Sequence, residues 1–455
     1  MTTQNRPIYL DQASEFLYAT TLGSISQQAR ARAIAIVADC LAVIAAGMQV
    51  KEMQSFYLAH SRTSAKGVAS IIGTGSSAST LDAALLNGTA GTWLELDEGN
   101  LFAMGHPGIQ IVPAAFAVAQ EIGASGAELL RAVTLGYELS ARIARSATLR
   151  INVHPHGTYG VIGAAIAVGL LKKFKASQLR ELLNVSATMG LATSRNTLLE
   201  GATVRNIYTG HSAYMGQMAV KLVEAGFTGE KDGVGTTFGK VLSDTFDAQR
   251  VVAELGAEWL IAQNYFKLHC TGRYVHSAID ALEDALTHTD AQAFTFAAIE
   301  RIEVKAYKFA AMLGGKNIST SFGARFSIPF ALATILYHGK SDLKGFDEDA
   351  VANPDIQTLM QRIDVVEEPV FNLTYPAEQR CRVEITLQNG IRFVGNCFVT
   401  KGESAKPHTA SELKNKFMNL GSPIWGQEQA LELFETLSSL ETLQNISDLS
   451  TRFAL

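Results

Sequence analysis

Apolar residues recur at the three- and four-residue spacing of helices from about Leu10 to Gly226, and no strand-like alternation competes with this pattern. The pattern predicts a long all-helical region. Gly, Ser and Pro separate its candidate helices, which span residues 27–48, 81–96, 113–122, 125–144, 158–174, 176–191 and 213–225. Small residues at interior positions, as in 163–169, would let neighbouring helices pack closely.

The pattern changes beyond about Thr271, where apolar and polar residues alternate with the period of two that is typical of strands. The alternating runs cover residues 302–306, 383–387 and 391–393. Asn389-Gly390 lies between the last two runs and predicts a hairpin with a type I′ turn, which needs positive φ at both positions. Helical spacing returns over residues 410–420 and 428–440.

These patterns predict a mainly α protein with a large all-helical domain and a smaller α+β domain. The length of 455 residues fits two or three structural units. We expect the C-terminal helices to pack back on the first region, so that the helical domain is discontinuous and covers 1–268 plus 408–455. The α+β domain then covers 269–407. The sequence shows no repeat of fixed period, which disfavours a solenoid.

The composition excludes global disorder, since 47% of the residues are apolar and only 18% are charged. A net charge of −5 gives no electrostatic reason to bind nucleic acid or an anionic membrane, so we expect neither partner. Four widely separated cysteines without a CxxC spacing argue against a disulfide framework, zinc and iron–sulfur sites, and favour a reducing cytoplasm. The N-terminus lacks the pattern of a secretory signal, and the longest apolar stretch, 33–48, is too short to span a bilayer.

The first candidate cluster is an acidic turn, Glu95-Leu-Asp97-Glu98, followed by His106 in a Gly-His-Pro-Gly loop. Carboxylates near an imidazole can form a general acid–base pair. The alternative is a solvated acidic turn, but a histidine between turn-forming residues is seldom a core residue. We therefore interpret this cluster as a candidate acid–base pair.

The second cluster, His154-Pro-His156-Gly, precedes a Gly-rich apolar helix whose N-terminal N–H groups favour an anion. A zinc site is the weaker interpretation, because histidines at i and i+2 cannot share a helix face and no third ligand of zinc spacing follows. The third cluster contains Arg205 and Tyr208. A guanidinium can bind a carboxylate through two donors, and the alternative is an exposed arginine with no role.

The fourth cluster, residues 266–280, places Lys267, two histidines and Arg273 where the helical pattern gives way to strands. Ligand clefts favour such junctions, and the alternative is a solvated polar connector. Lys267 could bind a carboxylate or donate a proton. We expect Asp280 to orient a neighbour or cap a turn. Tyr307 is a weaker candidate, whose simpler interpretation is a half-buried sheet tyrosine.

The sequence lacks the motifs of nucleotide-binding proteins, serine hydrolases and zinc peptidases, namely GxGxxG after a strand, GxxxxGK[ST], GxSxG and HExxH. The four clusters instead supply acids, imidazoles and cations. This set of groups is the one needed to bind a di- or tricarboxylate and to move a proton next to a carboxylate.

In their order and spacing, these clusters resemble the MmgE/PrpD family of dehydratases, decarboxylases and epimerases. The resemblance runs over nearly the whole chain and is carried by residues 87–90, 106–115, 154–165, 225–229, 267–280 and 324–329. It implies a helical domain built from both termini, a smaller α+β lid domain and a homodimer. It also implies an active site between the domains that uses no metal and no organic cofactor.

The resemblance further implies roles for residues of the four clusters. The expected catalytic residues are Asp97, His106, His154, Lys267 and, through a loose match, Tyr307. Among them, His106 and His154 are the main candidates for proton transfer. The expected substrate-binding residues are Arg205, His156, Tyr208, Arg273 and His276.

This sequence departs from the family pattern at two places. Dehydratase- and decarboxylase-like members usually show Asp-Asp-Thr where this chain has Asp97-Glu98-Gly99, and a lysine and a histidine where it has Arg205 and Tyr208. Because an arginine is a poor acid, a proton from that position is lost. The first hypothesis is a cofactor-independent dehydratase or decarboxylase of a small di- or tricarboxylate, such as 2-methylcitrate or cis-aconitate. The others are an epimerase of an imino- or amino-dicarboxylate and a non-catalytic helical binding protein.

Overall fold

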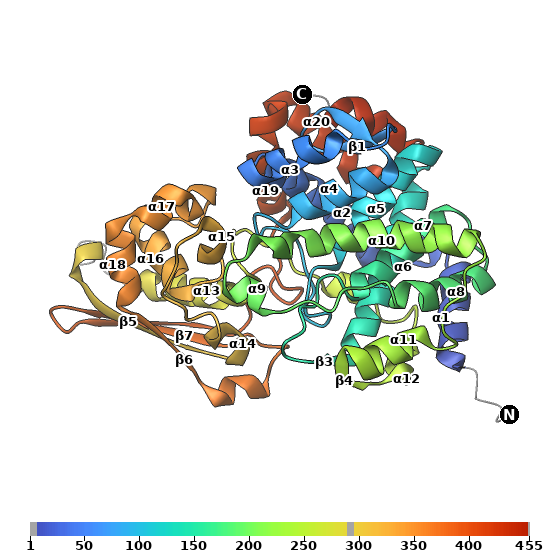
Figure 1. Cartoon of the computed structure of the whole chain (residues 1–455). Helices are drawn as coiled ribbons and strands as arrows, with labels where there is room; N and C mark the ends of the chain where they lie inside the picture. Colours follow the sequence, from blue (N-terminus) through green and yellow to red (C-terminus); the bar gives the residue numbers. More distant parts are fainter. Residues whose placement is uncertain (1–6, 289–294, 454–455) are drawn as a thin grey trace.

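The computed structural model describes residues 7–288 and 295–453, and it shows a large helical part beside a smaller part built on a sheet (Figure 1). The prediction of a mainly α protein is confirmed. The main helices of the large part are α2 (Gln27–Met48), α4 (Thr80–Gly91), α5 (Pro107–Ile122), α6 (Gly126–Arg145), α7 (Tyr159–Leu171), α8 (Ala176–Ala187) and α10 (Ile207–Glu224).

Helix α7 lies at the centre of the helical part and is buried along its whole length. It packs against α5, α6 and α10, while α4 packs against α2 and α10. The backbones approach closely where the sequence has glycine, since a Cβ on Gly88 of α4 would lie 2.8 Å from the Cα of Gly210 of α10. Small residues therefore bring these helices together, as the sequence indicated.

Two predicted helix ends next to the acidic turn are wrong, and they bear on the site. Helix α4 ends at Gly91 rather than at residue 96, because the chain then turns and Glu95 takes a left-handed conformation with φ of 53°. Helix α5 begins at Pro107 rather than at Pro113. A proline suits the first helical position, where its missing N–H has no intrahelical partner in any case.

The expectation that no strand interrupts residues 10–226 is also wrong. Strands β1 (Ala69–Ile71) and β2 (Ser76–Ala78) form a small antiparallel hairpin, and β3 (Ala147–Leu149) pairs antiparallel with the distant β4 (Ser243–Phe246). Strands of three or four residues are too short to show a period of two in the sequence.

The smaller part is built on a four-stranded sheet of order β6-β5-β7-β8. The strands are β5 (Ile299–Ala306), β6 (Ile363–Glu367), β7 (Cys381–Leu387) and β8 (Arg392–Cys397). Strands β5 and β6 are parallel, and the other two pairs are antiparallel. Helix α13 (Arg273–Thr287) packs on β7 and β8 and also contacts α16 (Ile328–His338), which packs on α18 (Pro354–Gln361). The α+β prediction for this region is confirmed.

The predicted hairpin between β7 and β8 exists, but its turn is not type I′. Gly390 has φ of 82°, whereas Asn389 is not left-handed. The N–H of Gly390 donates to Leu387 O, and the N–H of Leu387 donates to Ile391 O. This pattern fits a longer loop in which a turn is followed by one left-handed glycine.

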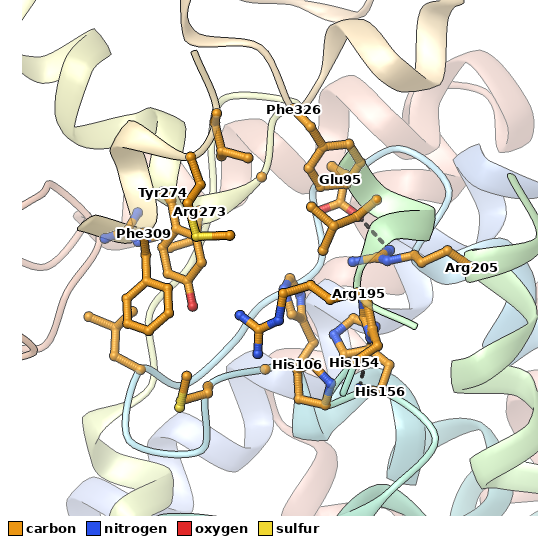
Figure 2. A pocket seen from close by; sticks show the side chains of 18 of the residues that line it. Glu95, His106, His154, His156, Arg195, Arg205, Arg273, Tyr274, Phe309 and Phe326 are labelled. Carbon is orange, nitrogen blue, oxygen red and sulfur yellow. Dashed lines mark hydrogen bonds and ion pairs between the residues drawn. The ribbon is translucent and has the colours of Figure 1, made fainter. Parts of the chain in front are cut away.

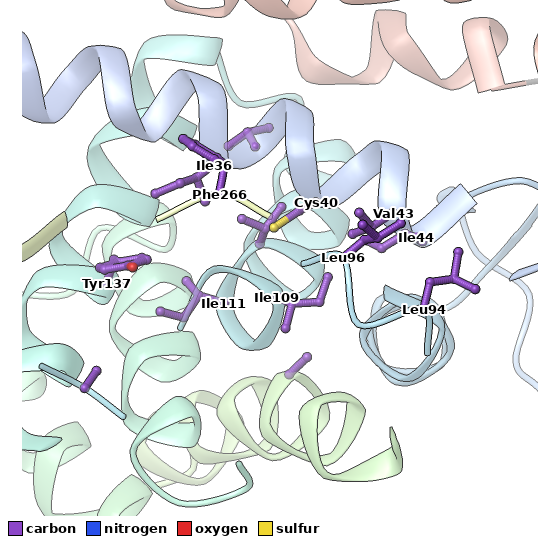
Figure 3. Close-up of a cluster of buried hydrophobic side chains, with 14 of the residues drawn as sticks. Ile36, Cys40, Val43, Ile44, Leu94, Leu96, Ile109, Ile111, Tyr137 and Phe266 are labelled. Carbon is purple, nitrogen blue, oxygen red and sulfur yellow. The ribbon is translucent and has the colours of Figure 1, made fainter. Parts of the chain in front are cut away.

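The C-terminal helices α19 (Ala410–Trp425) and α20 (Gln427–Ser438) pack on α2, far from the sheet (Figure 1). This packing supports our proposed division into 1–268 plus 408–455 and 269–407. Within the described residues, α2 is the one helix long and apolar enough to cross a membrane, but 72% of its apolar window is buried. Figure 3 shows Ile36, Cys40 and Val43 of α2 among buried side chains of neighbouring segments. We therefore interpret α2 as a core helix.

Candidate active site

The acidic turn between α4 and α5 is buried rather than solvated. Glu95, Asp97 and Glu98 are each at most 1% exposed. The turn is held in place by backbone hydrogen bonds between Gly99 and Tyr265, so it lies against the junction segment that carries Lys267. The alternative of a solvated acidic turn is therefore wrong.

Ion pairs link this turn to three of the other predicted residues. Asp97 Oδ2 lies 2.7 Å from His106 Nδ1, and Asp97 Oδ1 lies 3.4 Å from Lys267 Nζ. Glu95 pairs with Lys267 at 3.3 Å and with Arg205 at 2.5 Å. Burial alone would raise the pKa of Asp97, but the charges of His106, Lys267 and Arg205 outweigh it and hold the pKa well below its ordinary value. Asp97 is therefore an anion that orients the His106 ring.

The His106 ring uses Nδ1 for Asp97, which leaves Nε2 as the nitrogen that can exchange a proton with a bound molecule. The ring centroid of His156 lies 4.8 Å away, and that of His154 lies a further 4.7 Å beyond His156. The structure thus brings the histidines of two separate sequence clusters into one group (Figure 2).

His154 presents a proton rather than a lone pair to its surroundings. Its Nδ1 accepts a hydrogen bond from the backbone N–H of His156 at 3.1 Å, so the neutral ring carries its proton on Nε2. Burial, together with the charges of Arg205 and Arg195, lowers its pKa well below the usual 6.5. The buried Nε2 has no hydrogen-bond partner within the described chain. His154 is therefore a neutral N–H donor available to a ligand.

These side chains line a cavity of about 710 Å³, part of which is open to solvent, between the helical part and the sheet part (Figure 2). Its polar wall includes Glu95, His106, His154, His156, Arg195, Arg205, Tyr265 and Arg273. Its apolar wall includes Leu198, Tyr274, Phe309, Met312 and Phe326. The cavity lies at the predicted junction, where both parts of the chain contribute side chains.

Arg195 is a cavity residue that the sequence analysis missed. It follows α8 in an irregular segment, where its Nη2 donates to Val153 O at 3.3 Å and its guanidinium lies 6.0 Å from the ring of Phe309. It forms no ion pair with a carboxylate in the described part of the chain, and its buried Nε has no partner. No periodicity or motif marks this arginine in the sequence.

The other arginines of the cavity are already neutralised. Arg205 pairs with Glu95, and Arg273 forms two hydrogen bonds with Glu403, at 2.7 and 3.0 Å. Arg273 also lies 4.4 Å from the ring centroid of Tyr265. Two predicted substrate-binding arginines therefore have carboxylate partners, whereas Arg195 has none among the described residues.

Comparison with known families agrees with this arrangement of clusters. The MmgE/PrpD N-terminal domain matches residues 11–250, and the MmgE/PrpD C-terminal domain matches residues 269–441. The chain belongs to the MmgE/PrpD family. The resemblance seen in the sequence is thereby confirmed.

Curated MmgE/PrpD relatives are similar over most of the chain. Cis-aconitate decarboxylase of Mus musculus is 22% identical over 383 residues, which cover 81% of this chain and 77% of that protein. The enzyme of the same name from Homo sapiens is 22% identical over 386 residues, with coverage of 81% and 78%. A cis-aconitate decarboxylase-like protein, oryM of Aspergillus oryzae, is 23% identical over 415 residues and covers 84% of both chains.

Five residues predicted from the MmgE/PrpD resemblance do not form the cavity wall. Asp97 and Lys267 lie one layer below it and are fully buried, so the solvated connector is wrong for Lys267. Tyr208 contacts His154 with ring centroids 5.5 Å apart. These three residues support the wall from behind.

The other two lie further from the wall. His276 lies behind Arg273, with its Nδ1 3.3 Å from the guanidinium. Tyr307 is buried at the end of β5, where it stacks on Tyr375 with ring centroids 5.0 Å apart. It is neither half-buried nor in contact with the cavity, because the strand directs it into the aromatic packing of the smaller part. Asp280 accepts the Lys401 N–H at 2.7 Å, consistent with an orienting residue.

Glu95, Asp97 and His106 each place one possible ligand atom within 4.8 Å of the others, as a metal site would. The same carboxylates, however, form ion pairs with the cationic side chains of Arg205 and Lys267. A divalent cation would meet this repulsion and would have to displace both partners. The arrangement suits proton transfer and anion binding better than metal binding.

Proposed function

We propose that this member of the MmgE/PrpD family is a lyase that transfers a proton at a carbon next to a carboxylate of a small di- or tricarboxylate. Dehydration and decarboxylation are both reactions of this kind. The names of the curated relatives make cis-aconitate the first substrate to test, and 2-methylcitrate is the second. The observation that supports the proposal is that Asp97 pairs with His106 at the wall of a cavity, which also holds Arg195, an arginine without a carboxylate partner in the described chain.

In the proposed reaction, Arg195 holds a carboxylate of the substrate. Asp97 fixes the His106 ring, so that Nε2 removes or returns the proton at the neighbouring carbon. The neutral His154 donates its Nε2 proton in a hydrogen bond to the oxygen on which charge develops. These groups bind the substrate and move the proton, so we propose that no cofactor takes part.

The proposal is tested by incubating the protein with cis-aconitate or 2-methylcitrate in D₂O and following the mixture by proton NMR. We expect loss of carbon dioxide or water from at least one substrate. His106→Asn and Asp97→Asn, checked for folding by circular dichroism, should lower kcat by about 10² to 10⁴. Full turnover by a folded His106→Asn protein would contradict the mechanism.

An epimerase of an imino- or amino-dicarboxylate is the second candidate, and Arg205 favours it. A guanidinium at this position cannot give up a proton, whereas the lysine that is usual in the family can. The site therefore has one proton donor fewer for protonating a product. The same NMR experiment, repeated with iminodisuccinate and aspartate, distinguishes the lyase from the epimerase. Deuterium in recovered iminodisuccinate or aspartate, without another product, would favour epimerisation. Binding without exchange or turnover would favour a non-catalytic binding protein.

We further propose that the protein acts as a homodimer in the cytoplasm, as the family resemblance implies. Light scattering of the purified protein should give a mass twice the 48.9 kDa of one chain. A single-chain mass at micromolar concentration would contradict the dimer.

A further inference from the structure

The charges around the cavity show how many carboxylates it can hold. Lys267 and Arg205 carry two positive charges, which Glu95 and Asp97 balance through their ion pairs. Arg195 is the cavity cation without a carboxylate partner in the described chain. The ion pairs in and behind this wall therefore leave one positive charge, that of Arg195, without a carboxylate partner in the described chain.

Hydrogen-bonding capacity allows a second carboxylate but not a third. All three nitrogens of Arg273 donate to protein acceptors, among them Glu403 and the Thr400 and Lys401 carbonyls. Arg205 still has a buried Nε without a partner in the described chain. Two guanidinium groups, those of Arg195 and Arg205, are thus able to bind a carboxylate, whereas that of Arg273 is already saturated.

Most of the remaining wall is apolar, although Asn100 and Tyr265 also line the cavity. Tyr274 and Phe309 stack with ring centroids 5.5 Å apart and an interplanar angle of 25°. Met312 and Leu198 also line the cavity, and Phe326 lies near Arg205, with the guanidinium 5.7 Å from its ring centroid. Figure 2 shows Arg195 between Tyr274 and Phe309 on one side and the histidines on the other. A ligand held by Arg195 would therefore place part of its surface on aromatic rings.

We propose that the substrate is a dicarboxylate with an apolar substituent, and that Tyr274, Phe309 and Met312 bind this substituent while Arg195 binds one carboxylate. This inference rests on the proposed function and narrows its substrate class, since such a dicarboxylate should bind more tightly than a tricarboxylate. A third carboxylate against the aromatic wall would lose its hydration without forming an ion pair in return. An alkyl or aryl group at the same place would bind more tightly, because burial of its apolar surface is favourable.

A matched pair of ligands tests the inference. Cis-aconitate is maleate with a carboxymethyl group, and 2-isobutylmaleate has the same shape with methyl groups in place of the third carboxylate oxygens. Titration calorimetry should show that 2-isobutylmaleate binds at least about tenfold more tightly than cis-aconitate. Equal affinity, tighter binding of cis-aconitate, or no binding of either would overturn the inference.

Three variants test which groups are responsible for binding. Arg195→Gln should weaken binding of both ligands by at least about tenfold, whereas Phe309→Ala should weaken only 2-isobutylmaleate. Phe309→Leu keeps an apolar surface and should retain most of the preference. If Arg195→Gln binds both ligands as tightly as the wild type, or if Phe309→Ala keeps the full preference, the inference is wrong.

Because calorimetry requires no turnover, the two proposals can fail separately. A wild-type protein that binds 2-isobutylmaleate preferentially but transforms no carboxylate would contradict the lyase and leave the ligand class intact. Turnover of cis-aconitate without a preference for the apolar ligand would support the lyase and overturn the inferred ligand class.

Discussion

Lys416 of α19 and Asp39 of α2 form a buried ion pair of 2.5 Å across 377 positions of the chain. The ammonium group also donates to Leu96 O at 2.6 Å, and Asp39 Oδ2 accepts the Glu98 N–H at 3.1 Å. The backbone on both sides of Asp97 is therefore held by this pair. The C-terminal helix thus supports the turn that carries a proposed catalytic carboxylate.

Lys416→Met should destabilise the protein by about 3 to 5 kcal/mol, because it leaves the Asp39 carboxylate buried without its partner. The free energy of unfolding, measured in urea, checks this expectation. The double variant Lys416→Met/Asp39→Asn should recover part of the loss, since no unpaired charge remains. If the single variant is as stable as the wild type, the pair does not hold the turn.

The close contact of α4 and α10 gives a second prediction. A Cβ on Gly210 would overlap with the Leu85 carbonyl and with Thr89, so the backbones of α4 and α10 would have to shift apart. Gly210→Ala should therefore cost about 1 to 3 kcal/mol of stability. Gly315→Ala is the matched control, since no atom lies within 4 Å of the added Cβ, and its effect should stay within about 0.5 kcal/mol. Thermal unfolding of both variants checks the contrast.

The sequence predicts this helical packing well because periodicity and small residues act locally. It also singles out His106, His154, Lys267 and Arg205, which the fold brings together from segments far apart. What the sequence cannot show is which charges pair. Arg195 has no local signal, and its importance arises only because Glu95 neutralises Arg205, a contact that depends on the tertiary fold.

Glu98 gives a prediction about pH. Burial first, and then the charges of Asp39 and Asp97, raise its pKa from 4.5 to about 8, although hydrogen bonds from Gly108 and Tyr137 lower it. The folded chain therefore keeps a proton that the unfolded chain has released. The contribution to stability is fully present below about pH 4.5 and is lost as the pH rises towards 8, by at most about 1.4 kcal/mol per pH unit.

Glu98→Gln cannot ionise and should lack this dependence. Urea unfolding at pH 5, 6, 7 and 8 should show the variant gaining stability relative to the wild type as the pH rises. Glu435→Gln, at an exposed position of α20, should run parallel to the wild type. If the free energy of unfolding of Glu98→Gln changed with pH in parallel with that of the wild type, Glu98 would be ionised in the folded chain.

The last prediction concerns His154. If this residue acts as a neutral N–H donor, a glutamine can partly replace it, because the side-chain amide also offers an N–H at similar reach. His154→Ala should lower kcat by about 10² to 10³ on the substrate found by NMR, and His154→Gln should lower it less. If His154 were instead the base, glutamine would be as poor as alanine, since an amide cannot take up the proton. A higher kcat for His154→Gln than for His154→Ala would support the donor role of His154 and leave His106 as the proposed base. Equal kcat values would contradict the donor role.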